Sequence, residues 1–229
     1  MISVIVPTYN EGANIAGLIE AVKQALDQAA LSDFEILIMD DDSPDGTAAL
    51  VNGMKDPRVH AVNRKGRPRG LSAAVIDGFG EARGGLLAVM DADFSHPPDV
   101  LPRLFKALLE EGADLAIGSR YVPGGGITNW PWKRRVTSRV ACWLARPVTR
   151  VKDATSGFFA LKKKSIEGVS LNPWGFKIGL EVAVKARHGG RFKEVPFVFT
   201  DRRAGESKLG TGVMFLYLKQ LLAIFFSKS

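Results

Sequence analysis

The 229-residue sequence predicts an α/β protein, with a mostly parallel sheet covered by helices on both faces. Two observations support this class. Short apolar runs alternate with stretches of helical spacing along the N-terminal half, as in successive strand–helix units. The predicted strands are apolar throughout, as expected where both faces of a sheet are buried. With 46% hydrophobic and 24% charged residues, the chain can form a sizeable core.

The elements of the N-terminal half follow one another closely. A β-branched run starts the chain, and the next stretch has apolar residues at helical spacing from Ile15 to Leu26. Ser43 or Asp45 is expected to cap the second helix, and prolines are tolerated at the start of the fourth. The expected strands span 2–6, 34–39, 59–62, 86–90 and 113–117, and the expected helices span 13–29, 45–54, 71–83 and 98–111.

The pattern changes after Gly118. Residues 121–132 are rich in Gly, Pro and Trp and predict a loop. A basic helix is expected over about 133–146, before Pro147. Its apolar residues form one stripe, made of Val136, Val140, Trp143 and Leu144. Further strands are expected at 157–161 and 192–199, and a helix at 176–188. No linker is visible, so we expect one domain, residues 1–229.

The C-terminal segment predicts an apolar helix over about 212–226. A membrane-spanning helix needs about 20 apolar residues, and Lys219 and Gln220 interrupt this one. We therefore do not expect it to span a bilayer unaided. Three alternatives stay open: a core helix, an amphipathic or apolar helix at a membrane interface, or the start of a region that precedes transmembrane segments.

The net charge of +7 arises from one stretch. Between Leu115 and Lys152 there are eight basic residues and no acidic one, whereas the rest of the chain has 23 basic and 24 acidic residues. Such a patch favours an anionic partner: nucleic acid, phospholipid headgroups or a phosphorylated substrate. A solvated surface is the plainer alternative. The eight residues are Arg120, Lys133, Arg134, Arg135, Arg139, Arg146, Arg150 and Lys152.

The single cysteine, Cys142, excludes an internal disulfide and a cysteine-based zinc cluster, and it fits a reducing compartment. No basic region or cleavage site follows Met1, so we expect no secretory signal. The sequence also lacks the glycine-rich dinucleotide motif, the P-loop and the common hydrolase and metalloprotease motifs.

Acidic and polar clusters stand at the ends of three predicted strands, at 7–11, 40–46 and 91–93. Ligands of parallel α/β sheets bind beyond the carboxyl ends of the strands. Converging carboxylates would repel one another unless a cation neutralised them. A hard divalent ion, bound by one or two carboxylates and by substrate phosphates, is the usual solution. Helix capping and turn formation are the alternative roles for Asp40 and Asp42.

Six segments together carry a family resemblance: 7–11 (PTYNE), 40–47 (DDDSPDGT), 91–98 (DADFSHPP), 118–121 (GSRY), 155–158 (TSGF) and 202–208 (RRAGESK). In residues and in order they resemble family 2 glycosyltransferases, and most of all the dolichol-phosphate (polyprenol-phosphate) mannose synthase branch. The resemblance implies a GT-A fold and the inverting transfer of mannose from GDP-mannose to a polyprenyl phosphate. It also implies a peripheral protein at the cytoplasmic face of a membrane.

The resemblance further implies partners and site residues. An anionic membrane surface and a membrane-spanning partner subunit are expected as partners, and nucleic acid is not. Asp91 and Asp93 would bind Mg²⁺ or Mn²⁺, and Ser95 stands where some relatives have a longer glutamine that adds a metal contact. The donor nucleotide would be bound by Pro7, Tyr9, Glu11, Asp41, Asp91, Ala92 and Asp93. The acceptor phosphate would be bound by Arg120, Arg134, Ser138, Arg202 and Lys208. Asp93, Arg120 and Arg202 would be the catalytic residues.

Other branches carry a carboxylate base in mid-chain, where this sequence has no acidic residue before Asp153. Glu181 lies on the following predicted helix. An acceptor phosphate is already ionised at pH 7, so it needs arginines that position it rather than a base. Three alternatives remain: another donor such as UDP-glucose, a catalytically silent subunit, and a basic nucleic-acid-binding protein in which Asp91 and Asp93 have no role.

Trp130, Trp132 and Trp143 flank the basic helix. Because tryptophan favours the headgroup level of a membrane, we expect these residues at the membrane interface. The alternative is that they pack in the core, above all Trp143, which lies on the apolar stripe.

Overall fold

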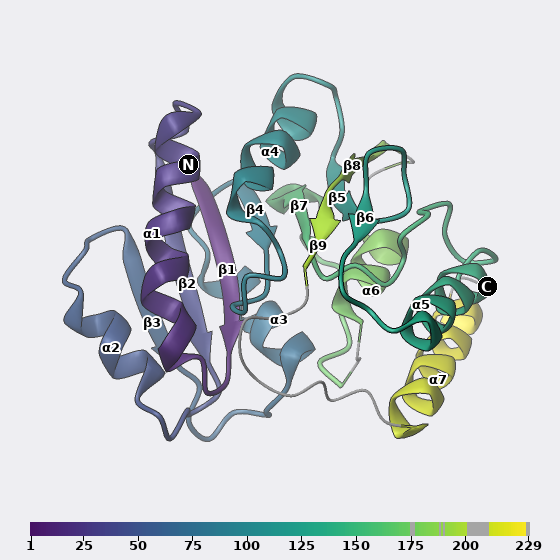
Figure 1. Ribbon diagram of the computed structural model, residues 1–229, viewed down its shortest axis with the longest axis horizontal. Helices are drawn as coiled ribbons and strands as arrows, with labels where there is room; N and C mark the ends of the chain where they lie inside the picture. The colour runs from purple at the N-terminus through teal and green to yellow at the C-terminus, as the bar shows by residue number, and fades with distance from the viewer. Residues whose placement is uncertain (175–176, 188, 190, 201–210, 228–229) are drawn as a thin grey trace.

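The computed structural model describes residues 1–174, 177–187, 189, 191–200 and 211–227, with side chains in the last range described for 217–226. Within these residues a seven-stranded sheet has the order β3–β2–β1–β4–β7–β5–β8 (Figure 1). Its strands are β1 (Ile2–Thr8), β2 (Phe34–Asp40), β3 (Val59–Asn63), β4 (Leu86–Val89), β5 (Leu115–Ser119), β7 (Phe159–Lys162) and β8 (Phe192–Pro196). Only β7 runs antiparallel to its neighbours. The predicted mostly parallel sheet is confirmed.

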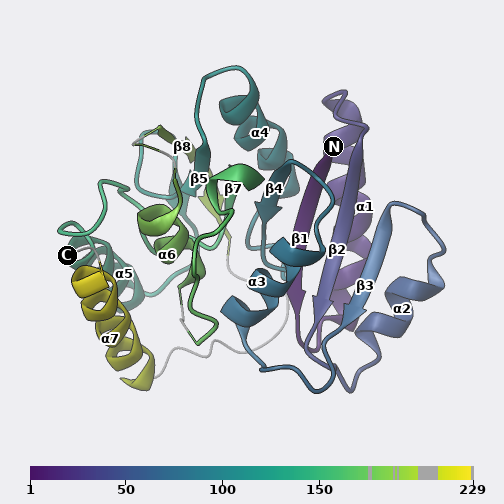
Figure 2. The same ribbon diagram turned by 180° about the vertical axis from the view of Figure 1, so that it is seen from behind.

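Helices cover both faces of this sheet, as predicted. On one face lie α1 (Gly12–Gln28), α2 (Thr47–Gly53) and α4 (Leu101–Leu109). On the other lie α3 (Leu71–Glu81) and α6 (Ile178–Lys185), which are nearer the viewer in Figure 2. Two short 3₁₀ turns are η1 (Pro98–Val100) and η2 (Lys163–Ser165).

The apolar pattern of the sequence explains this layering. In β1, Val4 and Val6 pack in the core beneath α1, whereas Ile5 packs in the core beneath α3. The strand is therefore apolar at every position because it is buried on both sides. In α1, the apolar residues at helical spacing are all fully buried: Ile15, Leu18, Ile19, Val22 and Leu26.

Some predicted elements differ from the structure in their bounds: the helix expected at 98–111 is η1 followed by α4, and the strand expected at 157–161 is β7. The second helix begins at Thr47 rather than residue 45, because Gly46 is the N-cap and adopts a left-handed conformation with φ of 78°. The strand expected over 192–199 is split. β8 ends at Pro196, and the chain continues as β9 (Val198–Phe199), which pairs with β6 (Gly126–Ile127) in a separate two-stranded sheet.

A third apolar cluster joins α5 (Trp132–Leu144), α6 and α7 (Thr211–Ser227). α5 and α7 lie side by side at the edge of the molecule in both views, and the Tyr217 hydroxyl donates to the Ala141 carbonyl at 2.7 Å. The buried side of α7 includes Tyr217, Leu221 and Ile224. Its exposed side carries large apolar residues: Leu218, Leu222, Phe225 and Phe226. None of the helices described here is both long and apolar enough to cross a membrane.

The tryptophans are placed differently from what the apolar stripe of α5 suggested. Trp143 is 70% exposed, and Val136 and Val140 on the same stripe are also exposed. The side of α5 that packs inward consists of the smaller residues Ala141 and Cys142. Trp130, which precedes the helix, is instead buried at 8% exposure. The core alternative is therefore wrong for Trp143, and interface placement is wrong for Trp130.

Candidate active site

The polar clusters at the ends of β1 and β2 are joined by hydrogen bonds. The Thr8 hydroxyl donates to Asp40, and the backbone amide of Ser43 donates to the same carboxylate. In return, the Ser43 hydroxyl accepts from the backbone amide of Asn10 at 3.0 Å. Asp40 is fully buried, so its carboxylate shapes the turn, as the alternative interpretation of this residue held.

Asp41 is held by a buried arginine that the sequence analysis missed. Arg64 donates to the Asp41 carboxylate, and the backbone amide of Gly70 donates to its second oxygen at 2.8 Å. Arg64 is 1% exposed and also donates to Asp77 and to the carbonyl of Pro68. A buried arginine needs anionic partners, so the position of the Asp41 carboxylate is tightly fixed.

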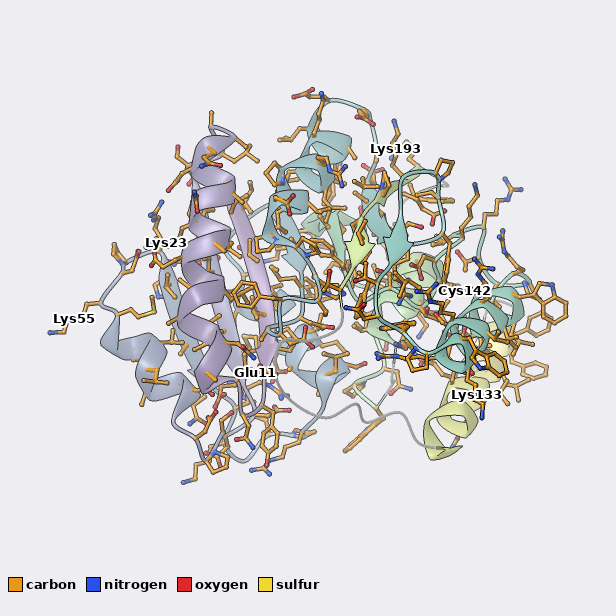
Figure 3. All side chains as sticks on the ribbon, viewed as in Figure 1. Glu11, Lys23, Lys55, Lys133, Cys142 and Lys193 are labelled. Carbon is orange, nitrogen blue, oxygen red and sulfur yellow. The ribbon has the colours of Figure 1, made fainter. Side chains whose placement is uncertain are left out.

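The same edge of the sheet has more open side chains. Tyr9 is 41% exposed, and the guanidinium of Arg69 lies 5.7 Å from the centre of its ring. The Glu11 carboxylate accepts from Asn14 at 2.9 Å, and Figure 3 shows Glu11 where β1 ends and α1 begins. Pro7 is the half-buried residue near the end of β1. The four predicted nucleoside-binding residues, Pro7, Tyr9, Glu11 and Asp41, are thus together at one edge of the sheet.

The Asp91–Ala92–Asp93 segment follows β4 at this edge. Asp93 is 5% exposed and accepts from the backbone amide of Ser95, whereas Ala92 packs in the core beneath α1. The backbone amide of Asp91 donates to Nδ1 of His96 at 2.9 Å. Burial lowers the pKa of His96, although Asp91 and Asp93 oppose this. His96, which stacks on Phe158, is therefore a neutral acceptor that holds the backbone of Asp91.

These residues fit a divalent cation that shares its ligands with a substrate. Among the described residues there is no cluster of three or more His, Cys, Asp or Glu side chains suited to a metal ion. Two carboxylates at one strand end suit a hard cation whose remaining ligands are phosphate oxygens or waters. The hydroxyl of Ser95, two residues after Asp93, is buried and has no hydrogen-bond partner in the described part of the chain. It is therefore available to a ligand or water at this place.

Arg120 is buried in an ion pair. Its Nε and Nη2 donate to the two oxygens of Asp153, each at 2.7 Å, and Nη2 also donates to Thr155 at 2.8 Å. The family resemblance implies that Arg120 binds the acceptor phosphate. Asp153 and Thr155 engage two of its three guanidinium nitrogens, and its role at the phosphate stays a prediction.

Trp130 brings two predicted acceptor residues together. The guanidinium carbon of Arg134 lies 3.9 Å from the centre of the Trp130 ring, and that of Arg120 lies 5.4 Å from it. Ser138 lies beside Tyr121, whose pKa is raised by burial and lowered in part by the Ser138 hydroxyl. Arg120, Arg134 and Ser138 therefore gather where β5 meets α5. Arg202 and Lys208, the other predicted acceptor residues, lie outside the described residues.

Lys177 is a further cation that the sequence analysis missed. Its Nζ donates to the carbonyl of Thr155 at 3.4 Å. Burial and the nearby Arg120 lower the pKa of Lys177, whereas Asp91 and Asp153 raise it. Nothing in the local sequence separates Lys177 from the many surface lysines, so no pattern could have found it.

A basic cavity of about 560 Å³ lies between the C-terminal half of α5 and the loop after β5. Arg139, Arg146 and Lys152 line it, with exposed Trp143 on the same helix. No carboxylate is among the described residues that line the cavity. Part of the stretch 115–152, which contains no acidic residue, therefore forms a concave basic surface.

Comparison with known proteins agrees with this geometry. The family description "Glycosyl transferase family 2" matches residues 3–174. The chain belongs to glycosyl transferase family 2. This membership confirms the resemblance drawn from the six motifs. Among solved structures, it is similar to mannosyl-3-phosphoglycerate synthase from Rubrobacter xylanophilus, with a TM-score of 0.75, 18% identity, and coverage of 100% of this chain and 74% of that one. That likeness confirms the GT-A fold.

A second similar structure is glucosyl-3-phosphoglycerate synthase from Mycobacterium tuberculosis, solved with Mn²⁺, UDP and glucosyl-3-phosphoglycerate. Its TM-score is 0.71 at 23% identity, over 99% of this chain and 79% of that one.

Curated relatives in the family have a higher sequence identity to this chain than these two solved structures. A dolichol-phosphate mannosyltransferase of Pyrococcus furiosus is 44% identical over 96% of this chain, which spans 62% of that relative. The Saccharomyces cerevisiae dolichol-phosphate mannosyltransferase is 40% identical over 99% of this chain and 87% of its own length. The polyprenol monophosphomannose synthase of Mycolicibacterium smegmatis is 42% identical over 90% of this chain and 80% of its own length. These relatives confirm the resemblance to the dolichol-phosphate mannose synthase branch.

Proposed function

We propose that this family 2 glycosyltransferase transfers mannose from GDP-mannose to a polyprenyl phosphate and forms polyprenyl-phosphate mannose. The observation that carries the proposal is the pairing of two sites on one sheet edge. The carboxylates of Asp91 and Asp93 suit a metal–diphosphate donor, and Arg120 and Arg134, gathered around Trp130, suit a phosphate acceptor. The names of the curated relatives support the choice of mannose and of a polyprenyl phosphate.

The donor binds at the ends of β1, β2 and β4. In this proposal Pro7, Tyr9, Glu11 and Asp41 hold the nucleoside, and 91–93 face its diphosphate. Asp91 and Asp93 would hold Mg²⁺ or Mn²⁺, which supplies positive charge against the leaving diphosphate when bound. The buried contacts of Asp41 with Arg64 keep this part of the site rigid before the donor arrives.

Transfer proceeds by one displacement. An ionised oxygen of the acceptor phosphate attacks the anomeric carbon on the face opposite the nucleotide, and a new bond between this carbon and the phosphate oxygen forms. The bond between the anomeric carbon and the diphosphate breaks, and its electron pair leaves with GDP. An α-linked donor therefore gives a β-linked product. No proton needs to be removed, so the lack of a mid-chain carboxylate base does not impede the reaction.

Arginines hold the acceptor phosphate. Arg120, Arg134, Ser138, Arg202 and Lys208 are proposed to contact it directly. Asp153 fixes the buried guanidinium of Arg120. Asp93, Arg120 and Arg202 remain the proposed catalytic residues.

The reaction is proposed to take place at the cytoplasmic face of a membrane, with residues 1–229 acting as one catalytic domain. The exposed apolar residues of α7 and the exposed Trp132 and Trp143 of α5 would contact the lipid. The basic cavity beside Trp143 favours an anionic membrane surface. A membrane-spanning partner subunit would be compatible with the same surface.

The deciding experiment supplies the protein with polyprenyl phosphate in vesicles and with GDP-mannose, UDP-glucose or UDP-GlcNAc in turn. Labelled lipid product is then measured for each donor. Product from GDP-mannose alone is expected. Lipid product from UDP-glucose instead would show that the proposed donor is wrong and that the proposed acceptor is right. No lipid product from any donor, together with salt-dependent binding of nucleic acid, would contradict the proposal.

A further inference from the structure

Lys177 lies at the junction of the proposed donor and acceptor sites. Its Nζ contacts the carbonyl of Thr155, and the hydroxyl of the same threonine accepts from Arg120. Two residues further on, Gly157 adjoins Asp91, because a Cβ added there would lie 3.8 Å from Oδ1 of Asp91. One short segment thus connects Lys177 to the arginine of the acceptor site and to the aspartate of the donor site.

The charges around this junction favour an anion. Arg120 and Lys177 both contact Thr155; Arg120 is 8% exposed and Lys177 is half-buried. The positive charge of Arg120 helps to lower the pKa of Lys177, and an anion bound near both groups would offset this repulsion. Asp91 and Asp153 also act on Lys177 and raise its pKa, but Asp153 is paired with Arg120 and Asp91 is the proposed metal ligand. A phosphate group is a further anion that the proposed reaction brings to this place.

A residue of the C-terminal helix fixes the backbone of Lys177. The amide of Lys177 donates to Oε1 of Gln220 at 3.1 Å, and Nε2 of Gln220 donates to the carbonyl of Lys177 at 3.3 Å. Gln220 is 7% exposed, so both hydrogen bonds are sheltered from water. A primary amide can donate and accept at once, which an apolar or carboxylate side chain of similar size cannot do.

We propose that Lys177 contacts the phosphate of the acceptor during transfer, and that Gln220 is the positioning residue that holds Lys177 in place. The inference rests on the proposed function, because it takes a polyprenyl phosphate as the acceptor. The inference gives a role to Gln220, which interrupts the apolar sequence of α7. The outer side of this helix is apolar, and Gln220 on its inner side holds the backbone of the proposed phosphate-binding residue.

Variants test the two residues separately. Lys177→Met removes the charge and keeps most of the length, and Gln220→Leu removes both hydrogen bonds. The matched controls are Lys164→Met and Lys219→Gln, which change exposed lysines on the surface and on α7. Each protein is titrated with farnesyl phosphate by tryptophan fluorescence and with GDP plus Mg²⁺ by calorimetry. Initial rates are also measured with polyprenyl phosphate at saturating GDP-mannose.

Lys177→Met is expected to weaken farnesyl phosphate binding and to lower kcat/KM for polyprenyl phosphate by about 10- to 100-fold. Lys177→Arg should retain part of both. Gln220→Leu should lower the same two quantities by about 3- to 10-fold, as expected when neutral hydrogen bonds are lost. GDP binding should change by less than about 3-fold in every variant, which also shows that the proteins are folded, and the controls should resemble the unaltered protein.

Farnesyl phosphate affinity that is the same in Lys177→Met and Lys164→Met would overturn the inference. So would a loss of GDP binding as large as the loss of farnesyl phosphate binding, since this would indicate general damage. An unaltered protein that binds no farnesyl phosphate would overturn it too. Failure of the proposed function looks different, because the protein would then bind farnesyl phosphate through Lys177 and yet transfer no mannose from GDP-mannose.

Discussion

The guanidinium of Arg134 stacks on the buried ring of Trp130, with 3.9 Å between the guanidinium carbon and the ring centre. Arg120 approaches the same ring, and Phe199 packs against it edge-on at 5.1 Å. An indole attracts cations through the negative potential of its faces. Trp130 therefore orients two arginines that are 14 positions apart in the sequence.

Trp130→Leu should lower kcat/KM for polyprenyl phosphate by about 3- to 30-fold, since a sheltered cation–π contact contributes roughly 0.5–2 kcal/mol. GDP binding should stay close to normal because the proposed nucleotide-binding residues lie elsewhere on the sheet edge. Trp174→Leu is the control, since Trp174 is 75% exposed. Steady-state rates measured at varied acceptor concentration give kcat/KM for both variants. Equal losses of kcat/KM in Trp130→Leu and Trp174→Leu would argue against a role for Trp130 in acceptor use.

Asp93→Ala should abolish turnover, and Asp91→Ala should weaken donor binding, because the donor diphosphate would lose the cation that these carboxylates are proposed to hold. EDTA should have the same effect on the unaltered protein, and added Mg²⁺ or Mn²⁺ should reverse it. Asp99→Ala, at an exposed position on η1, serves as the control. Full activity in EDTA would remove the metal from the reaction.

Asp153→Asn should destabilise the protein by about 3–5 kcal/mol, since it leaves the buried guanidinium of Arg120 without its charge partner. Urea unfolding at neutral pH measures this effect. The control is Glu110→Gln, which removes one member of the exposed pair with Lys106 and should cost no more than about 1 kcal/mol. Similar unfolding midpoints for the two variants would show that Arg120 does not depend on Asp153.

Asp114 should make the stability of the protein sensitive to acid. Its hydrogen bond with Lys162 and its contact with Arg191 lower the pKa of this carboxyl in the folded state, against the desolvation that raises it. Its contribution is therefore complete above the unfolded pKa of 3.8 and is lost as the pH falls through the lower folded value. Asp114→Asn should cost about 1–3 kcal/mol at pH 7, and this cost should shrink as the pH falls below 3.8. Urea unfolding from pH 7 downward measures the difference in stability between Asp114→Asn and the unaltered protein, with Asp99→Asn as control. A difference that grew in acid would contradict the prediction.

Replacing Arg139 and Arg146 together with glutamine should weaken binding to anionic vesicles by about 10- to 30-fold, at about 1 kcal/mol for each charge near a membrane. Binding to neutral vesicles should change little, and high salt should reduce the difference. Lys55→Gln with Lys65→Gln is the control, because both lysines are exposed and flank β3, an end strand of the sheet. Figure 3 shows Lys55 far from α5. Sedimentation with vesicles gives the affinities, and equal losses in the two double variants would exclude the basic cavity from membrane binding.

The fold and part of the site could be predicted because their signals are local. The spacing from Ile15 to Leu26 indicates α1 directly, and Asp91 and Asp93 follow a short apolar run that predicts a buried strand. The family resemblance places the other donor residues at neighbouring strand ends, where the structure also has them.

Contacts between distant segments could not be predicted. Arg64 pairs with Asp41 across 23 positions, Arg120 with Asp153 across 33, and Lys177 with Gln220 across 43. Each pair satisfies a buried polar group, but only the folded chain determines which group is buried. The apolar stripe on α5 led to a wrong prediction for a related reason. Helical spacing shows that Trp143 and Val140 lie on the same side of the helix, but it does not show whether that side faces the protein or the solvent.

The buried Arg64 also affects how donor preference could be engineered. Residues 64–70 form the loop beside Tyr9 and Asp42, and Tyr9 is a proposed nucleotide-binding residue. If that proposal holds, exchanging this loop between relatives would be a way to alter the choice of nucleotide. Arg64 is the anchor of the loop, and its partners Asp41 and Asp77 lie outside it. A graft that brings in an uncharged residue at position 64 would leave Asp41 without its cation. A transplanted loop must therefore keep Arg64, or the two aspartates must be exchanged with it as one unit.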